Sequence, residues 1–581
     1  MENARKTLKI GNSDFKRIVE NNHYFVDKTL LIYDFYNSAS DVLLIPRPRR
    51  FGKTLNLSMI EHFFDINKKE SKKLFSEYEI SKKTDFCNQH QNKYPVINLS
   101  LKSIKASNWD DCYELLKNEI SELYKKHKYL LKSSKLESYE KQIVENLILE
   151  KGSLKDNKYS LKYLSEYLKT HFGNEVLILV DEYDTSIIYS YDASFGKNKR
   201  EGNEKYYSNV IEFMRIFLGE AFKGNENLEK GLITGIMRIA RESIFSEMNN
   251  FNVFSITSSY FSDNFGFTES ETRAILKYYN LQDTYNEIKK WYDGYTFGKT
   301  NNIYNPWSIV NYIAFNKDGF KPYWVNTGSD ILIKEHITKP DRDKTYNTIQ
   351  KLLSGEYIEK ELHEDFVFTD FDTDRDLLWT LLTFSGYLTQ NGKADRDSYK
   401  LEIPNFEIKK VFKSIVIKWL DNKVNVKREL LISTAEYLVN NKIKEFEKGF
   451  KQIMGDTFSY FDTGNNPERI YQSYVLGLLA VLGDEYIIKS NRESGEGRYD
   501  ILLLPHDKSK YGIVIEIKTI KTKDHPSRQK EINQSLNKAL KQINKNKYYK
   551  ELIENKIAAE NIIKLPIVFV GKEVFIQNSL R

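Results

Sequence analysis

Gly52, Lys53 and Thr54 form a glycine–lysine–threonine sequence that is typical of a phosphate-binding loop. The apolar run 42–45 ahead of them predicts a buried strand, and residues 52–64 predict a helix. Backbone amides at a helix start attract an anion, Lys53 adds a positive charge, and the Thr54 hydroxyl is a suitable ligand for magnesium. The chemistry that this stretch suggests is binding of a nucleotide through its phosphates.

The loop departs from a complete phosphate loop at Arg47, which stands five positions before Gly52, where the full motif has glycine. Arginine cannot adopt every backbone conformation open to glycine. The loop alone therefore leaves two interpretations. Either it is a nucleotide site, to which Arg49 and Arg50 also contribute, or a strand and a helix are joined by a solvated basic turn.

Paired acids follow a second apolar run. Residues 176–180 are five consecutive apolar residues, and Asp181 and Glu182 come directly after them. Because a central parallel strand ends at a ligand cleft, Asp181 would hold magnesium and Glu182 would orient and deprotonate the attacking water. The alternative is a helix start favoured by negative charge. We expect Asp184 to be a surface acid.

A third strand candidate, 231–237, ends at Arg238, with Arg241 one turn later. An arginine at a strand end beside the site could contact the terminal phosphate or stabilise charge during phosphoryl transfer. The alternative is an arginine that pairs with Glu242.

A second chemical set lies near the C-terminus. Asp500 stands near the head of one predicted strand, and Glu516 and Lys518 alternate along the next, so these two share a face. Two carboxylates can hold a magnesium ion that activates water for phosphodiester cleavage, and a lysine can position that water. E-x-K also occurs as a salt bridge on exposed strands, but an unpaired charge within an apolar strand is costly.

Further segments must support these sites. Residues 95–101 predict another strand of the first sheet, and 109–149 and 161–172 predict helices that cover it. Thr268 and Glu271 predict a capping box at the start of a mainly helical region. Apolar residues before the loop are expected to pack in the core or to form a base pocket: Phe15, Ile18, Phe25 and Val26. Aromatic residues after Glu271 are expected to pack in the core rather than to stack on bases: Trp291, Tyr292, Tyr295, Tyr304, Trp307, Tyr323 and Trp324.

Length and composition set the class of protein. The 581 residues suggest about three units, and the net charge of +7 permits nucleic-acid binding without demonstrating it. Two cysteines, Cys87 and Cys112, are too few for a disulfide framework, which favours a cytoplasmic protein. We expect no export signal and no membrane anchor, because no apolar run approaches membrane-spanning length.

Six motifs in order resemble a bacterial AAA-ATPase-like family that carries a PD-(D/E)XK nuclease-superfamily domain at its C-terminus: RPRRFGKT at 47–54, VDEYD at 180–184, TGIMRIARESIFS at 234–246, FGFTESE at 265–271, WYDGY at 291–295 and YNPWS at 304–308. That family also has RPRRFGK at this loop, so Arg47 follows the family pattern. The GRYD…EIK pattern that ends at Lys518 looks like the nuclease signature.

The resemblance implies an α/β protein in three parts. Residues 1–269 would form an AAA-like P-loop domain with a parallel sheet and helices on both faces. Residues 270–430 would form a helical lid and linker, and 431–581 an α/β restriction-endonuclease-like domain. Glu468 resembles the extra metal-binding acid of many such nucleases, and Gln542 resembles a supporting glutamine. Some relatives place a tyrosine four residues after that glutamine, where this chain has Asn546, with Tyr548 later.

The sequence thus predicts an ATP-binding, nucleotide-regulated, magnesium-dependent nuclease that acts on nucleic acid, DNA more readily than RNA. The resemblance suggests a role in bacterial defence or mobile-element control. A homo-oligomer is compatible with a nucleotide site of this class. One alternative is an ATP-switched module whose inert nuclease-like domain only binds nucleic acid or protein. Another is a structural protein with an inert phosphate loop.

Overall fold

A computed structural model divides the chain into two compact units. Unit 1 comprises Met1–Ile337 and Glu359–Ile408, and unit 2 comprises Thr338–Ile358 and Lys409–Arg581. The structure describes residues 5–196, 198–238, 250–324, 342–353, 355–364, 368, 370, 374, 376–414, 428–457, 471–472, 475–476, 478–479, 482, 485–490, 493–494, 497–520, 527–571 and 573–577.

A five-stranded parallel sheet forms the centre of unit 1. Its order is β2-β3-β4-β1-β5, so β4 separates β1 from β3. The apolar runs expected to be strands are strands, and β1 and β3 are buried along their whole length, as a sheet covered on both faces requires. The bounds are β1 Val42–Pro46, β2 Val96–Ser100, β3 Val176–Asp181, β4 Leu228–Gly235 and β5 Phe251–Val253.

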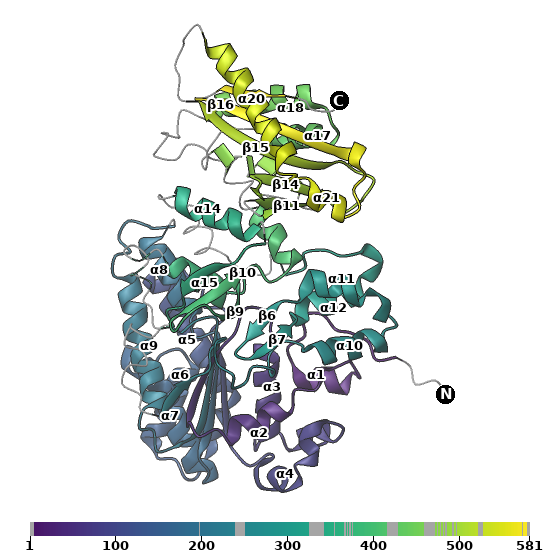
Figure 1. The fold of residues 1–581 in the computed structure, drawn as a ribbon. Helices are drawn as coiled ribbons and strands as arrows, with labels where there is room; N and C mark the ends of the chain where they lie inside the picture. Colours follow the sequence, from purple (N-terminus) through teal and green to yellow (C-terminus); the bar gives the residue numbers. More distant parts are fainter. Residues whose placement is uncertain are drawn as a thin grey trace. The chain divides into compact units, whose positions relative to one another are not determined.

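Helices cover both faces of this sheet. Figure 1 shows α3 (Lys53–Phe64) on one face and α5 (Trp109–Lys126), α7 (Leu154–Phe172) and α9 (Tyr206–Phe222) on the other. Side chains fix their starts, because Asn108 caps α5 and Ser153 forms a capping box before α7. The smaller helices of this part are α1 Phe15–Glu20, α2 Leu30–Tyr36, α4 Thr84–His90, α6 Ser138–Ile148 and α8 Thr185–Phe195.

The rest of unit 1 mixes helices with short strands. The predicted capping box of Thr268 and Glu271 is present at the start of α10 (Glu269–Tyr278), and most of the aromatic residues named above pack in a buried core, as expected. The pattern is not purely helical, because two small antiparallel sheets are interleaved with the helices. These elements are α11 Tyr285–Tyr292, α12 Pro306–Ala314, α15 Leu377–Phe384, β6 Tyr295–Phe297, β7 Thr300–Ile303, β8 Ile358–Glu361, β9 Thr389–Lys393 and β10 Ser398–Glu402.

Unit 2 is built on a second five-stranded sheet, in the order β11-β14-β15-β16-β17. The central pair, β15 and β16, is parallel, and α20 (Arg528–Lys545) makes the crossover between them. All other neighbours in this sheet are antiparallel. The strands are β11 Tyr486–Ser490, β14 Ile501–Pro505, β15 Gly512–Ile520, β16 Ile562–Val570 and β17 Glu573–Ile576, with a small hairpin of β12 Glu493–Ser494 and β13 Gly497–Arg498.

Further helices in the described part of unit 2 are α14 Arg342–Leu353, α17 Arg428–Val439, α18 Ile443–Thr457 and α21 Lys550–Glu554. Among the described helices of the whole chain, none combines the length and apolarity needed to span a bilayer.

Candidate functional site

The loop between β1 and α3 has the backbone that its sequence requires. Gly52 caps α3 with φ +88°, in the left-handed region that favours glycine. Directly after it, Lys53 is 6% exposed, and its Nζ donates to the carbonyls of Arg47 and Pro48, both at 3.0 Å. Burial lowers the pKa of Lys53, and the nearby acids Glu182, Asp181 and Asp184 oppose that shift. The Lys53 ammonium group is thus held beneath the loop.

Arg47 fastens the loop to the rest of unit 1. Its side chain is fully buried, and its guanidinium donates to the carbonyls of Phe254 at 2.7 Å and Phe261 at 2.9 Å. The same group lies over the rings of Phe265 and Phe297, 5.3 and 5.2 Å from the ring centroids. The residue that replaces the motif's glycine therefore packs inward and leaves the loop surface to Arg49 and Arg50.

Thr54 and Asp181 meet at the carboxyl edge of the sheet. Thr54 Oγ1 donates to Asp181 Oδ2 at 2.6 Å. On the intervening strand β4, Thr234 Oγ1 donates to Asp181 Oδ1 at 2.6 Å. Both carboxylate oxygens are thus oriented by hydroxyl groups, and a hydroxyl beside a carboxylate is an oxygen donor set that suits magnesium. The sequence predicted the approach of Thr54 to Asp181 but missed Thr234.

The other acids of the VDEYD motif have different surroundings. Glu182 adopts φ +52° and lines the cavity described below. Asp184 is 1% exposed, so its expected position on the surface is wrong. Its Oδ2 accepts hydrogen bonds from the amides of Ile236 at 2.7 Å and Met237 at 3.2 Å, which compensates for its burial. Burial raises the pKa of Asp184 to about 6.

Arg238 follows the turn that Asp184 holds. It is partly buried and is not among the residues that line the cavity beside Lys53 and Glu182. A contact between Arg238 and a terminal phosphate therefore stays a prediction. Arg241 and Glu242, its alternative partner, lie outside the described residues.

A cavity of about 510 Å³ opens over the loop. One part of its lining is basic and suits phosphates, whereas the other part is largely apolar and suits a base. The basic side chains are Lys9, Lys28, Arg49, Arg50, Lys53, Lys102 and Lys105, and the apolar ones include Leu8, Ile10, Ile18, Phe25, Val26, Ile275, Trp307 and Val310.

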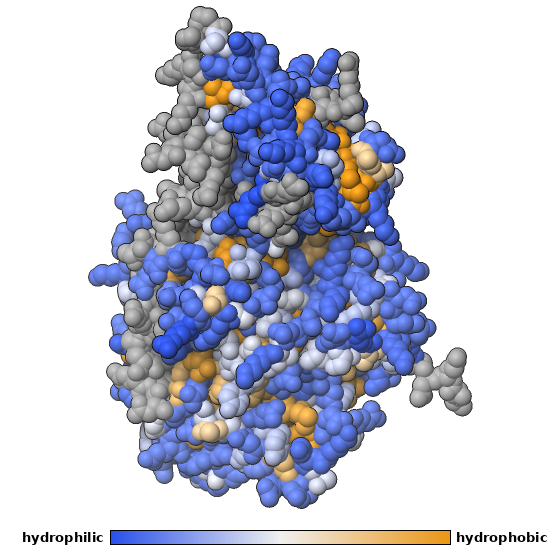
Figure 2. All heavy atoms as spheres, in the orientation of Figure 1, coloured by the Kyte–Doolittle hydropathy of each residue, from blue (hydrophilic) through white to orange (hydrophobic). Residues whose placement is uncertain are grey.

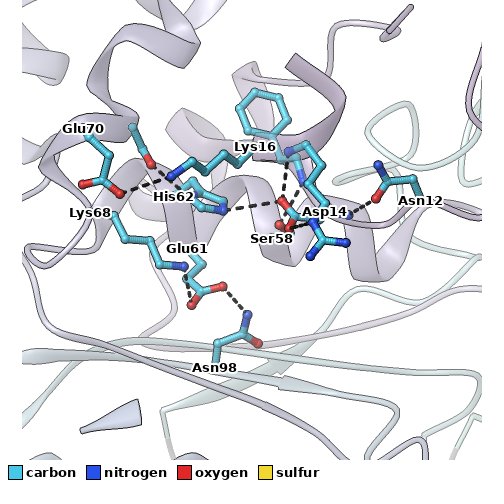
Figure 3. A network of polar contacts seen from close by, with 12 residues as sticks. Asn12, Asp14, Lys16, Ser58, Glu61, His62, Lys68, Glu70 and Asn98 are labelled. Carbon is cyan, nitrogen blue, oxygen red and sulfur yellow. Dashed lines mark hydrogen bonds and ion pairs between the residues drawn. The ribbon is translucent and has the colours of Figure 1, made fainter. Parts of the chain in front are cut away.

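Polar contacts join the N-terminal segment of this lining to α3, as Figure 3 shows. Ser58 Oγ on α3 accepts from the amide of Phe15 at 3.1 Å, and His62 Nε2 lies 3.8 Å from Asp14 Oδ1. On the same helix, Glu61 accepts a hydrogen bond from Asn98 of β2 at 2.7 Å and forms an ion pair with Lys68, which follows the helix. The helix that carries Lys53 and Thr54 is thus in polar contact with the N-terminal segment and with β2.

Arg50 has an aromatic support. Its guanidinium carbon lies 4.0 Å from the centroid of the Trp307 ring, and the Arg50 backbone has φ +68°. Burial lowers the pKa of Arg50, while the neighbouring Glu182 carboxylate opposes this. Stacking fixes the plane of the guanidinium at the cavity wall, where it can meet a phosphate oxygen.

In unit 2, the strand register brings Asp500 and Glu516 close together. Ile501 pairs with Ile515 across β14 and β15, and Asp500 Oδ2 accepts from the amide of Ile517 at 2.7 Å. Glu516 is 2% exposed, and Lys518 Nζ lies 2.7 Å from Glu516 Oε1. The three predicted residues thus lie close together beside the second half of β15.

Glu468 and Gln542 resemble supporting residues of the nuclease family, and the structure describes only Gln542. Glu468 lies outside the described residues. Gln542 Nε2 donates to the hydroxyl of Tyr548 at 3.1 Å, and Asn546 donates to the same oxygen at 2.9 Å. Sequence reasoning missed Gln472, whose amide donates to the Asp500 carbonyl at 2.8 Å. Over the described part of the chain, no three acid, histidine or cysteine side chains form a ready metal cluster.

Fold and sites together define a two-part protein, with a P-loop-type parallel sheet in unit 1 and a mixed sheet bearing Asp and Glu-x-Lys in unit 2. Residues 9–245 match the family model described as predicted AAA-ATPase, and 466–579 match that of the PD-(D/E)XK nuclease superfamily. The N-terminal part of the chain is thus similar to the predicted AAA-ATPases and the C-terminal part to that nuclease superfamily, which confirms the layout expected from the motifs.

Two known proteins are similar over much of the chain. A protein of Azotobacter chroococcum mcd 1, described as an uncharacterized protein in the vnfD 5' region, is 24% identical over 517 residues, which are 86% of this chain and 87% of that protein. Among solved structures, the Walker-type ATPase PABY2304 of Pyrococcus abyssi has a TM-score of 0.35 and 14% identity, covering 71% of this chain and 99% of that one.

Proposed function

We propose that this protein is a nucleotide-controlled nuclease in which unit 1 binds ATP with magnesium and unit 2 cuts phosphodiester bonds of nucleic acid. The observation that carries the proposal is the proximity of Asp500, Glu516 and Lys518 beside the second half of β15, in a chain that also has a basic cavity over a Gly-Lys-Thr loop.

In unit 1, different residues would bind the phosphates, the base and the magnesium ion of ATP and activate the attacking water. Arg49, Arg50 and Lys53 would neutralise the phosphates, and the apolar part of the cavity would hold the base. Thr54 and Asp181 would hold magnesium, which supplies charge neutralisation between the phosphates when bound. Glu182, on the cavity wall, would orient and deprotonate an attacking water.

In unit 2, Asp500 and Glu516 offer hard carboxylate oxygens that suit magnesium, which when bound supplies an activated water. Lys518 would position that water and neutralise charge that develops on the phosphate. Glu468 is proposed as a further ligand on sequence grounds alone.

DNA is the proposed substrate rather than RNA. The exposed lysines of α20 and the turn after it provide a basic face for a nucleic-acid backbone, and the surface over α20 is hydrophilic in Figure 2. These lysines are Lys530, Lys538, Lys541, Lys545 and Lys547. A cytoplasmic location accords with the free thiols of Cys87 and Cys112.

The test is magnesium-dependent cleavage of DNA and RNA by the full chain, with and without ATP. Asp500→Asn and Lys518→Ala should each lower cleavage by about a hundredfold or more, since Asp500 would hold the magnesium ion and Lys518 would position the water and neutralise charge on the phosphate. Matched changes of an exposed acid and an exposed lysine of unit 2 outside this basic face, Asp507→Asn and Lys508→Ala, should leave the rate of cleavage nearly unchanged. Cleavage that survives both site variants would reject the assignment.

The contact between Lys518 and Glu516 favours a second candidate, an ATP-switched binding module with an inert nuclease-like domain. A lysine that only neutralises a buried carboxylate needs no substrate. This candidate predicts salt-sensitive DNA binding without cleavage, with an affinity that Lys518→Ala does not change. A third candidate, a structural protein with an inert loop, predicts no ATP binding, so a thermal shift with magnesium ATP that Lys53→Ala abolishes would eliminate it.

A further inference from the structure

The carbonyl of Arg49, within the phosphate loop, has two side-chain donors from later parts of unit 1. Trp324 Nε1 donates to it at 3.2 Å, and Asn305 Nδ2 donates to it at 3.4 Å. Both donors come from residues that are at least nine-tenths buried, so solvent does not compete strongly for these bonds. A shift of the loop backbone at Arg49 would therefore disturb Trp324.

Trp324 is in turn bonded to Glu407. The Trp324 amide donates to Glu407 Oε1 at 2.6 Å, and Ser308 Oγ donates to Glu407 Oε2 at 2.8 Å. Glu407 is 1% exposed, and burial raises its pKa to about 7. A carboxyl group buried at this cost is retained in a fold when its hydrogen bonds are well satisfied, which fixes the geometry around it.

The same part of unit 1 also packs against the loop. Gly386 has φ +89°, and a Cβ placed on it would lie 2.9 Å from Cβ of Pro48, so the loop and the Gly386 turn are in close contact. Next to this turn, the ring of Tyr387 meets the Trp324 ring edge-on, with centroids 4.9 Å apart. The loop is thus held by packing as well as by hydrogen bonds.

These contacts involve Trp324, which is the last residue that the structure describes before the first passage into unit 2, and Glu407, which directly precedes Ile408 at the second passage. The chain enters unit 2 after Ile337 and again after Ile408, and Trp324 and Glu407 precede these two passages. We call residues 320–324 and 405–410 the connecting segments. The Glu407 carboxyl joins these two segments to each other, and Trp324 joins them to the phosphate loop.

We propose that Arg49, Trp324 and Glu407 couple nucleotide binding at the phosphate loop to the conformation of the two segments that lead into unit 2. We call these three residues the relay. Glu407 is a positioning residue in this relay, since it acts through Trp324. The inference rests on the proposed function, because it requires ATP at the loop, and it adds the route by which ATP would control unit 2.

The test measures hydrogen–deuterium exchange of the full chain with and without magnesium ATP. In the unsubstituted protein, ATP should protect peptides of the loop, 46–54, and of the connecting segments, 320–324 and 405–410. Trp324→Phe removes the Nε1 donor and keeps a ring, so it should retain protection of the loop and lose ATP-dependent protection of the connecting segments. Trp379→Phe, at a buried tryptophan of α15, is the matched control and should retain both.

Two variants of Glu407 separate the relay from a packing role. Glu407→Gln keeps an oxygen that can accept from the Trp324 amide and should retain the remote protection, whereas Glu407→Ala should lose it. The Kd for ATP should stay within about threefold in Trp324→Phe, while the stimulation of DNA cleavage by ATP should fall from about tenfold to none.

The possible failures are distinguishable. If ATP does not protect the loop peptides of the unsubstituted protein from deuterium exchange, ATP binding itself is refuted, and the relay is refuted with it. Protection of the loop that never extends to 320–324 and 405–410, or remote protection that persists in Trp324→Phe, overturns the relay and leaves ATP binding intact.

Discussion

Thr54 Oγ1 donates a 2.6 Å hydrogen bond to Asp181 Oδ2, so the start of α3 and the end of β3 are in direct contact across β4. The bond joins the two motifs that the sequence assigned to one magnesium site. Thr234 holds the other carboxylate oxygen, which leaves the Asp181 carboxylate little rotational freedom. Such preorganisation lowers the cost of gathering ligands around a cation.

The Thr54 hydroxyl should therefore matter for ATP only when magnesium is present. Thr54→Ala should weaken ATP binding by about tenfold in magnesium and little in excess EDTA, since the lost group would contact the metal rather than the phosphates. Calorimetric titration with ATP under both conditions measures this difference. Thr54→Ser should retain most of the affinity, and Thr84→Ala, at an exposed threonine of α4, serves as the control. Equal losses with and without magnesium would contradict the metal role.

Arg47→Gly, which restores the glycine of a complete phosphate loop, should damage the protein rather than improve it. The change removes a fully buried guanidinium that donates to Phe254 and Phe261, so it leaves a cavity and two carbonyls without these donors. The expected loss of unfolding free energy is about 3 kcal/mol or more. Thermal unfolding checks this, with Arg47→Lys expected to fall in between because it keeps the charge but not the planar group. A melting temperature unchanged in Arg47→Gly would show that the loop does not depend on this side chain.

The strands of unit 1 could be predicted because local patterns determine them. Val42–Pro46 and Val176–Asp181 are unbroken apolar runs except at their ends, and a run of that length that ends in polar residues is typical of a buried parallel strand. The contact between Thr54 and Asp181 follows once both strands belong to one parallel sheet. By contrast, β9 and β10 have mainly polar sequences, and their pairing within the sheet β8-β10-β9 makes them strands.

What the sequence missed depends on tertiary hydrogen bonds. Asp184 follows a charged pair and so resembles a surface residue, but the amides of Ile236 and Met237 meet it in the fold. The positions of Thr234 and Gln472 likewise depend on register and on helix placement. Such partners are far apart in the chain, and no local spacing encodes their approach.

Gln542 should contribute to the stability of unit 2 rather than to cleavage. Its amide donates to Tyr548, which is 2% exposed in an apolar cluster, so Gln542→Ala removes a bond within the fold. The expected loss is about 1 kcal/mol of unfolding free energy, with the cleavage rate nearly unchanged. Tyr548→Phe removes this bond together with the one from Asn546, so in denaturant unfolding it should lose at least as much stability. A large fall in cleavage for Gln542→Ala alone would restore the supporting role expected from the resemblance.

The buried carboxyl of Asp184 should make unit 1 less stable as pH rises toward neutrality. Burial raises its pKa to about 6 in the fold, against 3.8 as the ordinary value, so the folded state binds the proton more tightly than the unfolded state. The stabilisation is complete below about pH 4 and is lost as pH rises through about 6. Asp184→Asn removes this titration and can still place one oxygen to accept from Ile236 and Met237. Its melting temperature should therefore vary less than that of the unsubstituted protein between pH 4 and pH 7, whereas Asp184→Ala, which leaves two buried amides without an acceptor, should be destabilised at every pH by about 2 kcal/mol or more. Parallel pH profiles for the unsubstituted protein and Asp184→Asn would show that Asp184 does not titrate in this range.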